Sequence, residues 1–131
     1  MLADSKLDFE LSSDSLYYIV TGIGNDKSDR IVIPETYNGK SVKSIANDAF
    51  INQDHIREVI LPSSLKSIGD RAFKDCTGLY SIIIPTTVTS IGDEAFAGCS
   101  TIIINCKAKT RPDGWSESWA DTSATVFWEY K

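Results

Sequence analysis

The sequence predicts a repeat solenoid, a chain wound into stacked coils with a capping segment at each end. The segment SIGDRAFKDC, from Ser67, returns as SIGDEAFAGC, from Ser90, with seven of ten residues identical. A shorter version, SIANDAF, begins at Ser44, again 23 residues before Ser67. An aliphatic tripeptide followed by proline precedes each copy. Sequence units with a period of about 20 to 50 residues stack on one another, because a unit this short cannot bury a core alone.

The aliphatic tripeptides IVI, VIL and III are expected to form the strands of one sheet. Alternation along a strand directs every second side chain inward. The proline that follows each tripeptide lacks an N–H group and ends the strand. Further along each unit, two more aliphatic positions return to the core. The predicted core columns contain Ile31, Ile33, Val59, Leu61, Ile82 and Ile84, followed by Val42, Leu65, Val88, Ile45, Ile68 and Ile91.

The segments ANDAF, GDRAF and GDEAF are expected to form short helical turns. The Asn or Asp of each segment lies at the place of an N-cap, whose side chain accepts a hydrogen bond from a free N–H group. The alanine permits close approach of the coils, and the phenylalanine fills their widest part. Gly69 and Gly92 correspond to Ala46, so a left-handed backbone at this position is not obligatory. The aligned positions are Asn47, Asp70 and Asp93, then Ala49, Ala72 and Ala95, then Phe50, Phe73 and Phe96.

The chain is predicted to form one domain, residues 1–131. Residues 1–30 are expected to be an N-terminal cap, in which DFEL and LYYIVTGI flank the turn sequence SSDS and pair as a hairpin. Residues 31–104 hold the repeats, with a final strand at 102–104 and five extra residues between Pro34 and Ser44. Residues 105–131 contain all three tryptophans and a last strand, TVFWEY, and are expected to cover the end of the stack as a C-terminal cap.

Composition and charge exclude several classes of function. The net charge of −5 argues against a nucleic-acid partner, because phosphate binding needs a basic surface. No apolar run approaches the ~18 residues of a membrane span. The N-terminal stretch MLADSKLDFE has no basic segment followed by an apolar core, so we do not expect it to be a secretory signal; prior removal of a signal is the alternative that stays open.

No group of residues indicates catalysis, a metal or a cofactor. His55 is the only histidine and lies in a variable stretch between repeats, so no His-based nucleophilic pair can be assembled. The three cysteines form no CxxC pair for zinc. The acidic runs SSDS and NDKSD lack the glycine and terminal glutamate of an EF-hand loop. We therefore expect a protein that is not an enzyme.

The unit LYSIIIPTTVTSIGDEAFAGC resembles the BspA-like leucine-rich repeat, also known as the Treponema pallidum type, whose pattern is LxxIxLPxxLxxIGxxAFxxC. The resemblance covers residues 31–104, and departs from the pattern at Ala46, at Gln53 in place of the last cysteine, and at the five-residue insertion. It implies a right-handed solenoid with one parallel sheet on its concave side. It also implies a bacterial surface or secreted protein that adheres to host proteins or to other cells.

The outward positions of the predicted sheet are the candidate binding face. Alternation places four aliphatic residues in one outward column, with four mostly polar residues beside them. An exposed aliphatic stripe of this kind is typical of a protein-binding surface. The alternative is that β-branched residues simply favour strands and pair across the sheet. The aliphatic column is Val32, Ile60, Ile83 and Ile103, and the column beside it is Arg30, Glu58, Ser81 and Thr101.

The cysteines and tryptophans each allow two interpretations. Cys76 and Cys99 share a column, so they are either small buried thiols or a disulfide, and a bond between Cys99 and Cys106 is also open. Trp115 and Trp119 either cover the last coil or form a sugar-stacking platform. The hypothesis that follows is a protein-binding module, extracellular or at the cell surface. Two alternatives stay open: a structural spacer or end segment of a larger surface protein, and a glycan binder that uses the tryptophans.

Overall fold

The computed structural model describes residues 6–131, so the first five residues of the predicted N-terminal cap lie outside it. Within this range every regular element is a β-strand, and turns connect the strands. The strands are β1 (Asp8–Leu11), β2 (Tyr18–Gly22), β3 (Arg30–Val32), β4 (Thr36–Tyr37), β5 (Lys40–Ile45), β6 (Glu58–Ile60), β7 (Ser67–Ile68), β8 (Ser81–Ile84), β9 (Ser90–Ile91), β10 (Ile103–Cys106) and β11 (Thr125–Phe127).

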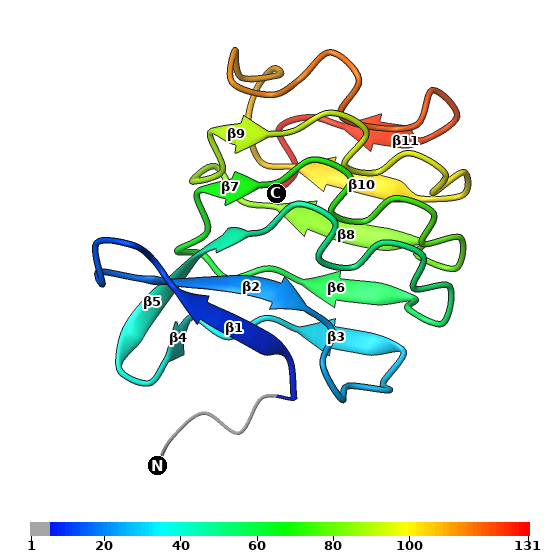
Figure 1. Ribbon diagram of the computed structural model, residues 1–131. Helices are drawn as coiled ribbons and strands as arrows, with labels where there is room; N and C mark the ends of the chain where they lie inside the picture. The colour runs from blue at the N-terminus through cyan, green and yellow to red at the C-terminus, as the bar shows by residue number, and fades with distance from the viewer. Residues whose placement is uncertain (1–5) are drawn as a thin grey trace.

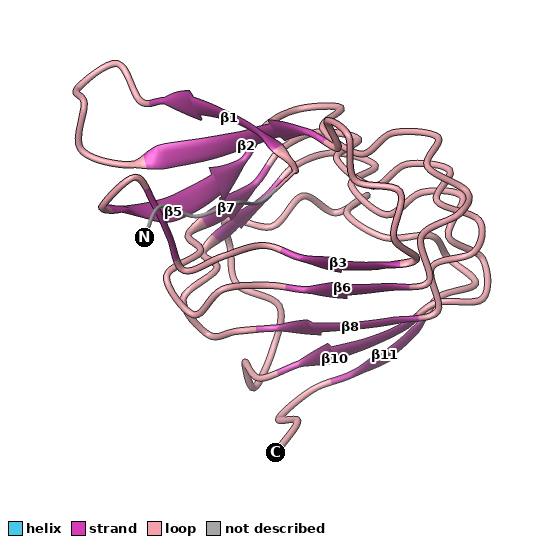
Figure 2. Ribbon diagram, turned by 90° about the horizontal axis from the view of Figure 1, so that it is seen from below, coloured by secondary structure: helices cyan, strands magenta, loops and turns pink. Residues whose placement is uncertain are grey.

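The strands form two sheets that enclose the core (Figures 1 and 2). One sheet has the order β11-β10-β8-β6-β3, and all its neighbours run parallel. The other has the order β1-β2-β5-β7-β9, with β4 added beside β5. The chain passes from one sheet to the other and back in each coil, so β6 is followed by β7 and β8 by β9. The predicted solenoid and its parallel sheet are confirmed.

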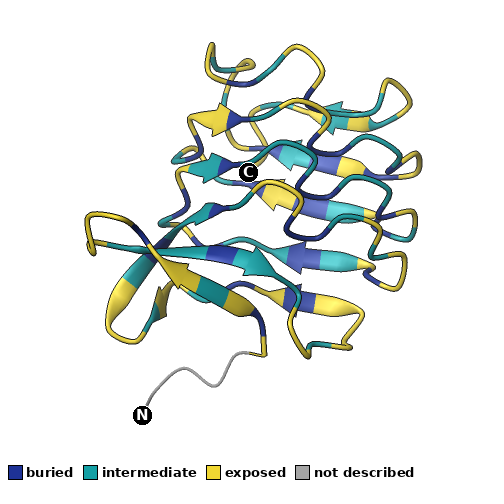
Figure 3. Cartoon of the chain, in the orientation of Figure 1, coloured by how far each residue is buried: buried dark blue, intermediate teal, exposed yellow. Residues whose placement is uncertain are grey.

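The predicted core columns lie between the two sheets. Figure 3 shows buried segments alternating with more exposed ones along the strands of the five-stranded sheet. The aliphatic residues of the columns are at most 2 % exposed, with the exception of Leu61. Phe73 stacks on Phe50 and on Phe96, with ring centroids 5.2 Å apart and planes within 6° of parallel. Equivalent side chains of successive coils therefore meet in one interior.

The Ala-Phe segments are extended turns, and the prediction of short helices is wrong. The backbone N–H of Phe50 donates to the carbonyl of Ala72 at 2.7 Å, and that of Phe73 donates to Ala95 at 2.8 Å. These donors bond to the next coil, while the N–H groups of Ala49 and Ile51 bond to carbonyls three residues earlier, at 3.3 Å, as in single turns. No continuous α-helical hydrogen-bond pattern forms. Left-handed residues turn the chain at the equivalent positions Asp48, Arg71 and Glu94, whose φ angles are 61°, 55° and 56°.

The predicted N-cap residues form a ladder from coil to coil. Asn47 Oδ1 accepts a hydrogen bond from the backbone N–H of Asp70, and Asp70 Oδ1 accepts one from that of Asp93, both at 2.8 Å. The Asp93 carboxylate in turn accepts from the Ser116 hydroxyl. Each side chain therefore satisfies a donor of the following coil and does not cap a helix of its own.

This ladder explains why a glycine stands directly before Asp70 and before Asp93. A Cβ on Gly69 would lie 2.4 Å from Asn47 Oδ1, and a Cβ on Gly92 would lie 2.1 Å from Asp70 Oδ1. Neither glycine has a left-handed φ, so close approach and not backbone conformation requires them. Ala46 lies in the first coil, where its N–H bonds instead to the Val20 carbonyl of the N-terminal hairpin.

The N-terminal hairpin is confirmed. β1 pairs antiparallel with β2, and β2 pairs parallel with β5, so the hairpin continues the sheet beyond the first coil. The five-residue insertion forms a second hairpin, β4–β5, closed by Asn38 and Gly39 with φ angles of 49° and 84°. Two consecutive left-handed residues with the sequence Asn-Gly are typical of a type I′ turn. Tyr37 of this hairpin stacks on Phe9 with ring centroids 4.0 Å apart.

Candidate protein-binding face

The outward side of the five-stranded sheet carries the predicted binding residues, and we name it the open face. Register defines two outward columns. One column contains Arg30, Glu58, Ser81, Ile103 and Thr125. The other contains Val32, Ile60, Ile83, Asn105 and Phe127. Ile60 and Ile83 adjoin each other because they directly follow the paired residues Val59 and Ile82.

The predicted columns are wrong at the last repeat. Ile103 pairs with Ser81 and not with Ile83, and it takes the place that was expected for Thr101. The reason is a deletion of one residue: two residues separate Leu79 from Ile82, whereas one separates Ile102 from Ile104. Ile103 still faces outward, with 42 % of its surface exposed, and Thr101 lies before the strand begins.

Apolar side chains dominate the open face. Val32 is 48 % exposed, Ile83 39 % and Phe127 53 %, while Ile60 between them is half-buried. Beside the apolar column, Arg30 Nε donates to Glu58 Oε1 at 3.2 Å, so these two charges largely offset each other. The face therefore presents an apolar stripe that runs from Val32 through Ile60 to Ile83, with Asn105 between Ile83 and Phe127 and one ion pair beside it.

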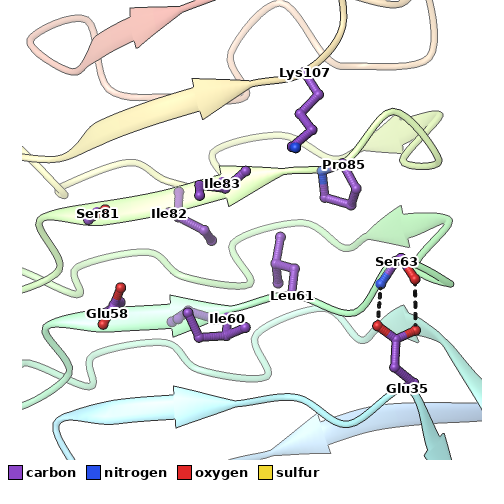
Figure 4. A pocket seen from close by; sticks show the side chains of 11 residues that line it. Glu35, Glu58, Ile60, Leu61, Ser63, Ser81, Ile82, Ile83, Pro85 and Lys107 are labelled. Carbon is purple, nitrogen blue, oxygen red and sulfur yellow. Dashed lines mark hydrogen bonds between the residues drawn. The ribbon is translucent and has the colours of Figure 1, made fainter. Parts of the chain in front are cut away.

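A groove opens in this face between β6 and β8. The two strands pair only at Glu58 with Ser81 and at Val59 with Ile82, whereas β8 and β10 stay paired as far as Ile84. Where β6 ends, the sheet leaves a depression of about 280 Å³. Its apolar surface includes Ile60, Leu61, Ile83 and Pro85 (Figure 4). Leu61 was predicted to be fully inside, but it is half-buried because it lines this groove.

Opposite charges lie at the two ends of the groove. The Glu35 carboxylate accepts the backbone N–H of Ser63 at 2.8 Å and the Ser63 hydroxyl at 3.0 Å, and the backbone hydrogen bond in particular lowers the pKa of Glu35. Lys107 lies at the other end, and its side chain extends toward Pro85 (Figure 4). Lys107 occupies the register position of the prolines in the earlier coils, and its backbone N–H donates to the Ile84 carbonyl at 3.1 Å.

Sequence reasoning missed the ends of the groove. Glu35 and Ser63 each follow the proline of a unit, and Lys107 stands where a proline is expected. Replacement of that proline by a charged residue was the available signal for Lys107. The opening between β6 and β8 has no counterpart in the repeat pattern, because the pattern is the same in both coils.

Comparisons with known proteins place these repeats in a family. A family model described as a BspA type leucine rich repeat region matches residues 27–112 in six copies. The chain belongs to the BspA-type leucine-rich repeat family. The comparison with curated proteins found no match.

Solved leucine-rich repeat proteins share the fold. A leucine-rich repeat protein from Bacteroides capillosus is 24% identical with a TM-score of 0.80, covering 98% of this chain and 97% of that one. The T. pallidum leucine rich repeat protein is 23% identical with a TM-score of 0.75, and this chain, covered at 96%, spans 63% of it. A leucine rich cell surface protein from Faecalibacterium prausnitzii is 24% identical with a TM-score of 0.70, covering 95% of this chain and 42% of that one.

The cysteines of these BspA-type repeats are buried free thiols. Cys76 Sγ donates to the Phe50 carbonyl at 3.0 Å, and Cys99 Sγ donates to the Phe73 carbonyl at 3.1 Å. Burial raises the pKa of Cys76, Cys99 and Cys106 to about 12. Neither of the two disulfides considered from the sequence is present, and the thiols are protonated at neutral pH.

The tryptophans cover the last coil of the repeat array. Trp115 is 2 % and Trp119 is 7 % exposed, and Trp119 meets Phe96 edge-on with ring centroids 6.1 Å apart. Trp115 Nε1 donates to the Val88 carbonyl at 3.1 Å. The expected cover is confirmed, and the exposed platform that sugar stacking needs is not formed by these two side chains.

The last residues considered from the sequence are the single histidine and the acidic runs. His55 is exposed on the surface. Across residues 6–131, no group of three or more His, Cys, Asp or Glu side chains is arranged to hold a metal ion. The same part of the chain contains no helix long and apolar enough to cross a membrane.

Proposed function

We propose that this protein is a non-catalytic recognition module that binds another protein through its open face. The observation that supports the proposal is the apolar stripe of exposed Val32, half-buried Ile60 and exposed Ile83 on a preformed parallel sheet, with exposed Phe127 beyond Asn105. Exposed contiguous apolar surface is costly in water and marks sites of association. Because the hydrogen bonds between coils already fix the sheet, binding requires little ordering of this surface.

The same proposal extends to location. The F. prausnitzii relative in fold is described as a cell surface protein. We propose that this chain acts at the bacterial surface or after secretion, in adhesion to a host matrix protein or a protein of another cell. A structural spacer within a longer surface protein is the competing function, and it requires no contact through the open face.

A pair of double variants distinguishes binding from a spacer role. Ile60→Glu with Ile83→Glu adds two charges to the apolar stripe. The control, Ser13→Glu with Thr89→Glu, adds two charges at exposed positions away from the open face, in the turn between β1 and β2 and just before β9. Biolayer interferometry against a panel of immobilised matrix and cell-surface proteins measures binding. We expect the first variant to lose binding to a panel protein by at least about tenfold, because each added carboxylate must be desolvated in the interface. The second variant should bind as the wild type does.

Circular dichroism and thermal unfolding of both variants test whether the fold is retained. Equal affinity of Ile60→Glu with Ile83→Glu and of the wild type for the same panel protein would rule out the open face as the binding surface. Failure of every panel protein to bind the wild type would favour the spacer.

A further inference from the structure

The geometry points to the chemistry of the partner: we infer that the groove binds an extended segment carrying a basic, an aliphatic and an acidic residue at alternate positions. The inference rests on the proposed function and specifies the part of the partner that enters the open face. Three features of the groove carry it: an apolar middle, charges of opposite sign at its ends, and the distance between those ends.

The middle of the groove fits an aliphatic side chain. Leu61, Ile83 and Pro85 line it, and its volume of about 280 Å³ is small for a ligand pocket. Leu61 is the one member of its column that is half-buried, whereas Ile33 and Ile84 are 2 % and 1 % exposed. A branched side chain that entered here would cover the exposed part of Leu61 and remove apolar surface from water.

The ends of the groove select charge. At one end the two hydrogen bonds from Ser63 hold the Glu35 carboxylate in one orientation. This carboxylate, which has no partner among the three ion pairs of the described residues, attracts a cation. At the other end is Lys107, which takes part in none of the three ion pairs of the described residues: Arg30 with Glu58, Arg71 with Asp48, and Lys74 with Glu94. Lys107 is therefore available to an incoming carboxylate.

The distance between the ends fixes the spacing of the motif. Glu35 follows β3 and Lys107 follows β10, which lie three strand steps apart in the order β3-β6-β8-β10. Neighbouring strands are about 4.8 Å apart, so the ends are separated by roughly 14 Å. An extended chain advances about 3.3 Å per residue and covers this distance in about four residues. Because alternate side chains of an extended chain share one face, the first, third and fifth residues all point into the groove.

Synthetic peptides test the inference on the intact chain. One peptide of about nine residues carries Lys, Leu and Asp at alternate positions among threonine and serine, and a second carries them in the reverse order. Both have blocked termini, so that their side chains supply the only charges. Each is titrated into ¹⁵N-labelled protein, and amide chemical shifts are followed. We expect one of the two orders to bind, with the largest shifts at the ends of β6, β8 and β10.

Substitutions in both partners show whether the named contacts form. Replacing Asp by Asn in the peptide, or Lys107→Ala in the protein, should each weaken binding about threefold to fivefold, the range of an exposed ion pair. The two changes together should weaken binding no further than either one, because they remove the same contact. Replacing the peptide Leu by Ala should weaken binding by about tenfold. Lys109→Ala, an exposed lysine two residues further along, is the matched control and should have no effect.

Several results would overturn the inference. These are no shifts with either peptide at millimolar concentration, equal binding of the Asn peptide, no effect of Lys107→Ala, or shifts that map outside the groove. Groove shifts that depend on protein concentration without peptide would place a second copy of the chain there and would also overturn it. If panel proteins still bind in a manner sensitive to Ile60→Glu with Ile83→Glu while the peptides do not, this inference fails and the proposed function stands.

Discussion

The residue type at single positions of this protein is restricted by side chains of the neighbouring coil. Gly92 has an ordinary backbone conformation, yet it leaves room for the Asp70 carboxylate, which would lie 2.1 Å from an added Cβ. The Asp70 carboxylate in turn accepts the N–H of Asp93. The glycine of one coil and the acidic residue of the coil before it therefore act as a pair.

Substitution of Gly92 tests this pairing. We expect Gly92→Ala to lower the free energy of unfolding by about 1–3 kcal/mol, the usual cost of forcing extra atoms into a packed site. Urea unfolding followed by circular dichroism measures the change. Adding Asp70→Ala should not restore the wild-type value, because the Asp70 backbone nitrogen would still lie 2.6 Å from the new methyl group and the Asp93 N–H would lose its acceptor. Ala46→Gly, at the equivalent position of the first coil, should change the free energy by less than about 1 kcal/mol. An unchanged midpoint for Gly92→Ala would contradict the close contact.

At the scale of elements, the strands were predictable and the turns were not. The strand columns follow from alternation, which the sequence displays directly at Ile31 and Ile33 and at Ile82 and Ile84. The turns at Asp48, Arg71 and Glu94 contain residues that also suit a helix start, so the sequence alone favoured a helix. Hydrogen bonds to the neighbouring coil decide the outcome, and these depend on a packing that the local sequence does not record.

The candidate site shows the same division. The open face and most of its aliphatic column could be predicted from periodicity, but Ile103 was misplaced because one residue is missing before β10. The groove depends on where the pairing of β6 and β8 stops. Its charged ends, Glu35 and Lys107, line one groove although they are 72 positions apart in the chain. Neither feature has a periodic signal.

The C-terminal turn that carries Trp119 is predicted to stabilise the end of the stack. Trp119→Ala should lower the free energy of unfolding by about 3–5 kcal/mol, because it removes the buried aromatic ring that covers Phe96 at the end of the stack. Trp128 is half-buried, so Trp128→Ala serves as the control and should cost less. Guanidinium unfolding followed by circular dichroism gives both values. A smaller loss for Trp119→Ala than for Trp128→Ala would contradict the covering role.

Over the whole molecule, stability comes from stacking and from the hydrogen bonds between coils. The three ion pairs lie at the surface, and pairs of this kind contribute about 0–1 kcal/mol each. The buried columns run through every coil and include Cys76, Cys99 and Cys106. Because these columns connect all the coils, we expect the thiols to become exposed and deprotonated only when the whole molecule unfolds.

The thiols predict a loss of stability at alkaline pH. Burial raises the pKa of each thiol from 9.0 in the unfolded chain to about 12 in the folded one. Between these values the unfolded state binds fewer protons, so the free energy of unfolding falls as pH rises from about 9 to about 12. Urea unfolding under reducing conditions at several pH values measures the slope. A variant with all three cysteines replaced by alanine should show a shallower decline, and an identical slope in both proteins would refute this origin.

The contact between the glycine of one coil and the Asp side chain of the coil before it also determines which repeat units can be duplicated. A duplicated segment spanning residues 67–89 would carry its own Gly69 and Asp70, so it would dock on its parent and receive the next unit without any further substitution. The unit with Ala46 lacks this freedom, because a copy placed after it would bring the Ala46 methyl group against the Asn47 side chain that reaches forward from the unit before. Tandem duplication of an interior unit is therefore compatible with the stack, whereas duplication of the first unit is not.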